Sequence, residues 1–136
     1  MKTLIPNVLE RLDPVIETVP VIFDSPHSGA VYPDDFEHAL PLDALRRAED
    51  AFVDDLYGAA PDYGATLLRA LFPRSYIDPN RRSDDIDPSL LAESWPEPLN
   101  PGPKVRLGIG LIRKKEIAGP VYARKLSVNE IRQRIV

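Results

Sequence analysis

The 136-residue sequence contains no cysteine, so it has no disulfide framework, no thiolate metal site and no cysteine nucleophile. Any metal held by this chain must therefore use histidine, aspartate or glutamate. Histidine is itself scarce, because the chain has two, His27 and His38. A chain without cysteine is compatible with a reducing compartment.

Long apolar runs and basic blocks are also missing. Nowhere do 18 apolar residues run together, and Met1 to Pro20 lacks the apolar core of a signal peptide, so we expect a cytoplasmic protein with no membrane contact. The formal net charge is −4 and the pI is about 5.2, which argues against nucleic acid and anionic lipid as partners. The expected partner is a small molecule.

The length and composition fit one domain, residues 1–136, with 43% hydrophobic residues to build its core. Proline is abundant, with 15 residues, about twice the average usage. Eight of these prolines follow Leu71. We therefore expect the second half of the chain to be rich in loops.

Hydrophobic periodicity predicts an α/β fold with an open, mostly parallel or mixed sheet and flanking helices. The helical pattern is either one helix or two short helices broken near Glu49 and Asp50, in which case Asp50 is an N-cap candidate. A long surface loop is expected over Arg81 to Lys104. The segments so assigned are a poorly patterned Met1–Glu17, strands at Val19–Phe23, Ala65–Leu71, Ser75–Asp78 and Val105–Ile112, and the helical pattern at Leu42–Tyr57.

The last helix has a well-marked start. Ser127-Val128-Asn129-Glu130 is a capping box, with Leu126 and Ile131 as a hydrophobic staple and an apolar face of Val128, Ile131 and Ile135. No glycine or proline stop follows it. This pattern predicts that the sequence is the N-terminal part of a longer domain.

His27 is the leading candidate for chemistry, because it follows a strand and lies among small residues in Ser25-Pro26-His27-Ser28-Gly29. A neutral imidazole there could ligate a metal or act as a general base. The alternative is a loop histidine satisfied by backbone hydrogen bonds. His38 has no such context, and we expect it to be exposed in a loop.

A set of carboxylates follows, at Glu49, Asp50, Asp54 and Asp55. Asp50 and Asp54 share a helix face by their spacing, so both could point towards the His27 loop and complete a metal site or orient the ring. A solvated helix face with an N-cap is the alternative reading of the same pattern.

Asn80 and Arg81 follow Asp78-Pro79, and an amide beside a guanidinium on a stiff turn suits the binding of a carboxylate. The alternative is a turn with a surface salt bridge to Asp84 or Asp85. Arg113 is a second, weaker candidate for carboxylate binding. Its preceding glycines do not form a phosphate loop, because the third glycine and the helix start are missing.

Taken together and in order, these segments resemble the N-formylglutamate amidohydrolase family, from about Pro20 to the end of the chain. No single motif is decisive, but four in register are specific. The matching segments are Ser25–Gly29, Glu49–Leu56, Pro73-Arg74 with Asp78–Arg81, and Gly108–Arg113 leading to Tyr122.

The resemblance implies an α/β fold related to the zinc carboxypeptidases and aspartoacylase-like deacylases, truncated here, with a divalent metal, zinc foremost. It implies hydrolysis of an N-formyl or similar N-acyl amide of an acidic amino acid. His27 and Asp50, with Glu49 as the alternative carboxylate, would be metal ligands. Asn80 and Arg81 would hold the substrate carboxylate, with Arg113 and Ser28 as further substrate-binding residues.

Family members continue for about as long again, and the catalytic acid/base and a further histidine ligand are expected in that continuation. The alternative function is therefore a catalytically incomplete fragment that binds a small carboxylate or needs a partner chain. A half sheet also leaves a strand edge uncovered, so self-association is expected.

Overall fold

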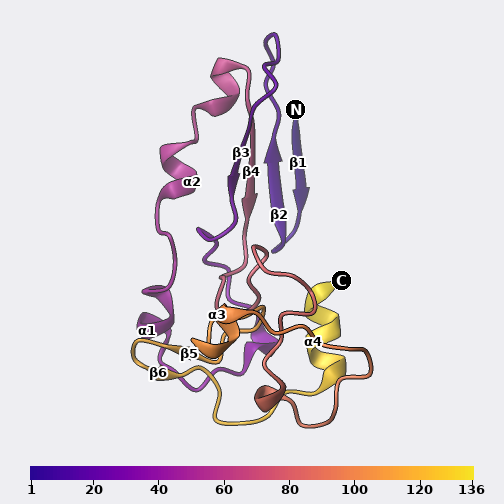
Figure 1. Cartoon of the computed structure of the whole chain (residues 1–136). Helices are drawn as coiled ribbons and strands as arrows, with labels where there is room; N and C mark the ends of the chain where they lie inside the picture. The colour runs from indigo at the N-terminus through magenta and orange to yellow at the C-terminus, as the bar shows by residue number, and fades with distance from the viewer. The chain divides into compact units, whose positions relative to one another are not determined.

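The computed structural model describes all residues from Met1 to Val136 (Figure 1). The chain divides into two compact units, each made of two segments. The first unit comprises Met1–Pro33 and Glu49–Arg74, and the second comprises Asp34–Ala48 and Ser75–Val136. Whether the two units act as the single domain expected from the chain length stays a prediction.

A four-stranded mixed sheet forms the first unit, with the order β1-β2-β4-β3 (Figure 1). The strands are β1 (Lys2–Ile5), β2 (Leu9–Leu12), β3 (Ile22–Ser25) and β4 (Thr66–Ala70). Two pairings, β1 with β2 and β2 with β4, are antiparallel, and β3 with β4 is parallel. The prediction of a mixed sheet is thus confirmed, and the alternative prediction of a mostly parallel sheet is wrong.

The hairpin of β1 and β2 lies in the segment that the sequence left without a pattern. The turn carries Pro6 and then Asn7 at φ 62°, and the Val8 N–H donates to the Ile5 carbonyl at 3.0 Å. Proline at the second position and a positive φ at the third are the signature of a type II turn. No element was assigned to the poorly patterned segment Met1–Glu17, because periodicity does not register this turn signal.

One face of this sheet carries the core of the first unit. Leu67 on β4 is fully buried, with Ala60 and Ala65 around it and Leu12 and Phe23 packed against the cluster. The short helix α2 (Val53–Leu56) and the 3-10 turn η2 (Ala60–Tyr63) belong to the same unit, and the Tyr57 ring lies 4.7 Å from that of Phe23.

The opposite face of the sheet is exposed at its edge strands. Pairing places Ile5 and Ile22 on the side of Thr66 and Ala70, away from Leu67, and they are 49% and 69% exposed. Ala70 on the central strand β4 is 8% exposed, so the exposure of this face is confined to its edges.

Two expected elements of this region are shifted. The strand expected at Val19–Phe23 forms at Ile22–Ser25, because the Val21 N–H bonds back to the Val19 carbonyl at 2.8 Å and the ladder with β4 starts only at the Val21 carbonyl. The helical pattern yields two short helices, α1 (Leu42–Arg46) and α2, with the break at Glu49 and Asp50 as expected. Asp50 is not the N-cap of α2: that position is Phe52, in the left-handed conformation at φ 66°.

The second unit has little regular structure, as its proline content predicts. Its longest helix has eight residues and its strands have two residues each. The elements are η1 (Asp34–Phe36), α1, η3 (Pro88–Leu90), α3 (Pro103–Arg106), β5 (Lys115–Glu116), β6 (Gly119–Pro120) and α4 (Val128–Ile135). The long loop expected over 81–104 contains only η3 before α3 begins.

Neither strand expected in this unit forms. Pro103 begins a helix at the first position, where its missing N–H costs nothing, and Gly108 at φ 76° ends it, so 105–112 is a helix end followed by turns. Residues 74–76 form a turn and residues 77–78 are irregular, with one bond from the Asp78 N–H to the Leu111 carbonyl at 2.9 Å.

The start of α4 is confirmed. Ser127 is the N-cap, and its hydroxyl accepts from the Glu130 N–H at 3.1 Å. Leu126 and Ile131 are fully buried, as expected for a staple, and Val128 is buried. Ile135 is 38% exposed, so the expected apolar face is shorter than the periodicity indicated.

A buried arginine on α4 organises the second unit. The Arg134 guanidinium lies 4.2 Å from the Tyr76 ring centroid and donates to the Tyr122 hydroxyl at 2.7 Å and the Tyr76 carbonyl at 3.1 Å. It also binds Glu130, which pairs with Arg124 as well. Burial alone would raise the pKa of Glu130, but the bonds and charges of the two arginines outweigh it and hold that pKa below its usual value.

His38 is half-buried, and the expectation that it is exposed was wrong. Its Nδ1 bonds the Leu40 carbonyl at 2.6 Å and its ring packs edge-on to Phe36.

None of the helices combines the length and the hydrophobicity that crossing a bilayer requires.

Candidate metal and substrate site

His27 lies two residues beyond the end of β3, as the sequence predicted, and is 8% exposed. Gly29 explains how this loop is held. A Cβ on Gly29 would lie 2.2 Å from the Phe72 carbonyl oxygen, and the Val31 N–H donates to the Leu71 carbonyl at 2.9 Å. The loop therefore packs directly on the backbone that leaves β4, and only glycine fits at this position.

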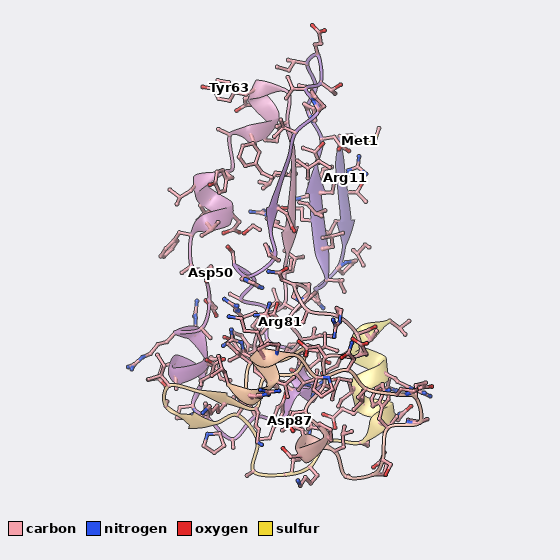
Figure 2. All side chains as sticks on the ribbon, viewed as in Figure 1. Met1, Arg11, Asp50, Tyr63, Arg81 and Asp87 are labelled. Atoms are coloured by element: carbon pink, nitrogen blue, oxygen red, sulfur yellow. The ribbon has the colours of Figure 1, made fainter.

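Asp50 faces His27. Its Oδ2 lies 3.2 Å from His27 Nδ1, and its N–H donates to the His27 carbonyl at 3.0 Å. The Ser28 hydroxyl donates to the Asp50 carbonyl at 2.8 Å. Three contacts, two of them to the Asp50 backbone, thus join segments that are 23 residues apart. Figure 2 shows Asp50 on the segment that leads into α2.

Arg74 joins this pair, and it had been assigned no role from the sequence. Its Nη1 donates to Asp50 Oδ1 at 3.3 Å, while the other carboxylate oxygen faces His27. The Arg74 side chain is 16% exposed. Arg74 could have been singled out from the sequence, because it follows Pro73 in one of the segments that resemble the family.

The other carboxylates near Asp50 make different bonds. Glu49 accepts from the Tyr32 hydroxyl at 2.8 Å, and Asp54 pairs with Arg69 of β4 at 3.3 Å. Asp50 is outside the helix, so the expected shared helix face of Asp50 and Asp54 does not exist. Of the two proposed carboxylates, Asp50 lies against His27 through its Oδ2.

The geometry of His27 and Asp50 suits a metal. Zinc bonds of roughly 2.0–2.2 Å to nitrogen and oxygen at a tetrahedral angle put the two donor atoms about 3.4 Å apart. The observed separation of 3.2 Å is close to that value. No group of three histidine or acidic residues that could hold a metal occurs in the structure, so this chain offers two ligands of the three that a catalytic zinc usually has.

Asn80 and Arg81 belong to the second unit and share one turn. The Asp78 carboxylate accepts from the Asn80 N–H at 3.0 Å, and the Asp78 carbonyl accepts from the Arg81 N–H at 3.1 Å. Asp78 is fully buried, whereas Asn80 is exposed and Arg81, labelled in Figure 2, is half-buried. The turn therefore presents the Asn80 amide from a rigid base.

The guanidinium of Arg81 is held by the backbone. Its Nε donates to the Ile109 carbonyl at 3.2 Å and its Nη1 to the Asn80 carbonyl at 2.8 Å. The surface salt bridge that was the alternative reading of this turn does form, between Arg82 and Asp84 at 2.9 Å.

Arg113 is buried, and its Nη1 lies 3.0 Å from both carboxylate oxygens of Glu116. Its bond is thus to a carboxylate of the chain itself. Of the residues singled out from the sequence, the structure brings together His27, Ser28 and Asp50 in the first unit and Asn80 with Arg81 in the second.

Comparisons with known proteins agree on one family. Residues 19–136 match a family model described as N-formylglutamate amidohydrolase. The crystal structure of N-formylglutamate amidohydrolase from Ralstonia eutropha JMP134 is similar to the chain with a TM-score of 0.90 and 50% sequence identity. That match covers 95% of this chain and 46% of the Ralstonia chain. Comparison with curated proteins gave no match.

Proposed function

Because the chain belongs to the N-formylglutamate amidohydrolase family, we propose that it contributes to the hydrolysis of N-formylglutamate or a similar N-acyl acidic amino acid in the cytoplasm. The chain spans about half the length of the Ralstonia enzyme, which supports the further proposal that the catalytic acid/base comes from polypeptide equivalent to the rest of that enzyme.

The contact between His27 and Asp50 carries the proposal. We assign these two side chains as ligands of a divalent metal, zinc foremost, as expected if the family is related to the zinc carboxypeptidases. A bound zinc would polarise the scissile carbonyl and lower the pKa of a water molecule to about 7. Asp50 would keep its orientation because Arg74 holds its second oxygen.

Substrate recognition is assigned to the second unit. An amide and a guanidinium, here Asn80 and Arg81, are donor types that suit the planar carboxylate of an acidic amino acid. The buried carboxylate of Asp78 stabilises the turn that carries Asn80 and Arg81, because it accepts from the Asn80 N–H. Arg113 is the further substrate-binding candidate, and it would have to exchange Glu116 for the substrate. Glu49 remains the alternative ligand to Asp50.

The proposal is tested by formate release from N-formylglutamate by the chain together with polypeptide equivalent to the rest of the Ralstonia enzyme, with and without a chelator. We expect chelation to abolish the activity, zinc to restore it, and the His27→Ala and Asp50→Ala variants to lose it. His38→Ala is the matched control, because His38 bonds a backbone carbonyl in the other unit. Undiminished activity of His27→Ala would refute the ligand assignment.

A second candidate function has its own observation in favour. The chain offers two ligands, and it could bind a small carboxylate through Asn80 and Arg81 without turnover until a partner chain completes the site. In that case, calorimetry would detect glutamate binding that Arg81→Ala abolishes, and no formate would appear. Stoichiometric zinc together with turnover by the 136-residue chain alone would rule this candidate out.

A further inference from the structure

The segment that carries Asp50 has no regular structure of its own. Residues 47–52 lie between α1 and α2, and Phe52, with φ 66°, is a non-glycine residue in the left-handed region. No side chain caps α2, and the Asp50 side chain is 49% exposed. The secondary structure therefore does not explain why the carboxylate stays beside His27.

Two serine hydroxyls supply a fixed support. Ser25, the last residue of β3, is 1% exposed, and its hydroxyl lies 2.7 Å from that of Ser28. The Ser28 hydroxyl lies 2.8 Å from the Asp50 carbonyl oxygen.

The direction of these bonds follows from their chemistry. A carbonyl only accepts, so Ser28 uses its single proton on Asp50 and must accept from Ser25, which therefore donates to Ser28. The hydrogen bonds run one way, from the end of the sheet to the backbone of Asp50.

We propose that Ser28, supported by Ser25, is a positioning residue that holds the Asp50 carboxylate at His27 for metal binding. This inference rests on the proposed function in its metal-binding part, and it gives Ser28 a role other than contact with substrate. Groups that orient metal ligands commonly contribute tenfold to hundredfold to metal affinity.

The first test measures zinc affinity of the full chain by competition with a chelating dye. Ser28→Ala should bind zinc about 10- to 100-fold more weakly, whereas Ser28→Thr, which keeps a hydroxyl, should retain most of the affinity. Ser25→Ala should have a smaller effect. Because Ser25 acts through Ser28, the double variant Ser25→Ala/Ser28→Ala should be no weaker than Ser28→Ala.

The matched control is Ser75→Ala. Ser75 is also 1% exposed, but its hydroxyl has no hydrogen-bond partner, so its removal should change neither the zinc affinity nor the Asp50 segment. Wild-type zinc affinity in Ser28→Ala, with affinity lost in His27→Ala, would overturn the inference. Equal losses in Ser28→Ala and Ser75→Ala would overturn it as well.

The second test needs no metal. Hydrogen exchange of the Asp50 amide, which donates to the His27 carbonyl, should be about fivefold faster in Ser28→Ala than in the wild type, and Ser28→Thr should restore it. If the wild-type chain binds no zinc, the metal-site proposal fails, and this exchange measurement still decides the positioning role. Unchanged exchange in Ser28→Ala would reject it.

Discussion

The two units hold their backbones together by different means. In the first, three strand pairings join the four strands of the sheet, and the buried charged or titratable polar residues are Glu10 and His27. In the second, the strands are two residues long, and four charged residues are buried, namely Asp78, Asp85, Arg113 and Arg134.

In the second unit, buried charged side chains bond backbone groups that strand pairing would otherwise satisfy. Asp78 accepts from the Asn80 N–H, Asp85 accepts from the Gly102 N–H at 2.6 Å, and Arg134 donates to the Tyr76 carbonyl. A loop buried in a protein must satisfy its backbone groups, and here charged side chains do so. The comparison predicts that single side chains matter more in the second unit than in the first.

The largest effect is expected from Arg134→Leu. The substitution leaves the Tyr76 carbonyl and the Tyr122 hydroxyl without their buried donor, and breaking such a buried network costs about 3–5 kcal/mol of unfolding free energy. Denaturant unfolding of the variant and the wild type measures this loss of unfolding free energy. The control is Arg132→Leu on the same helix, where a 47% exposed side chain pairs with Glu97 and its loss should cost less than about 1 kcal/mol. Equal losses would contradict the comparison.

A smaller effect is expected from Gly29→Ala in the first unit. The new Cβ would lie 2.2 Å from the Phe72 carbonyl oxygen, so the His27 loop must move away from the end of β4. Such overpacking costs about 1–3 kcal/mol. Gly58→Ala is the control in the same unit, because its Cβ meets the nearest atom at 3.1 Å. Thermal unfolding compares the two, and a Gly29→Ala protein as stable as the control would show that the loop can shift freely.

The smallest effect on stability is expected from Ile22→Asp. Ile22 is 69% exposed on β3, an edge strand, and we propose that this edge mediates the self-association expected from the sequence. A charge there should raise the dissociation constant measured by sedimentation and leave the unfolding free energy nearly unchanged. Leu56→Asp, at a 78% exposed position on α2, is the control and should leave association unaltered. A wild-type chain that sediments as a monomer at all concentrations would exclude this self-association.

Local signals predicted part of this structure. The position of His27 after a strand, the strand at β4 and the Ser127 cap each depend on a few neighbouring residues. The segment 105–112 was misjudged because its apolar residues fit a strand, whereas Pro103 and Gly108 impose a helix and its end. Here the backbone preferences of two residues outweighed the hydrophobic pattern.

The sequence indicated candidate site residues but not the contacts that support them. Spacing on a helix suggested Asp50, yet the observed pairing with His27 depends on a backbone bond between segments 23 residues apart. The contact of Arg74 with Asp50 and that of Ser28 with the Asp50 carbonyl are equally non-local. Periodicity describes one element at a time, so such contacts lie outside what it can indicate.

The hairpin of β1 and β2 limits which substitutions its segment tolerates. The family match begins at residue 19, and the hairpin lies before it, yet β2 pairs with β4 along its whole length. Without the hairpin, β4 would become an edge strand and expose the ladder beside the buried Leu67. Substitutions in this segment should therefore be tolerated where they keep the pairing of β2 with β4 and the turn at Asn7, and should destabilise the first unit where they do not.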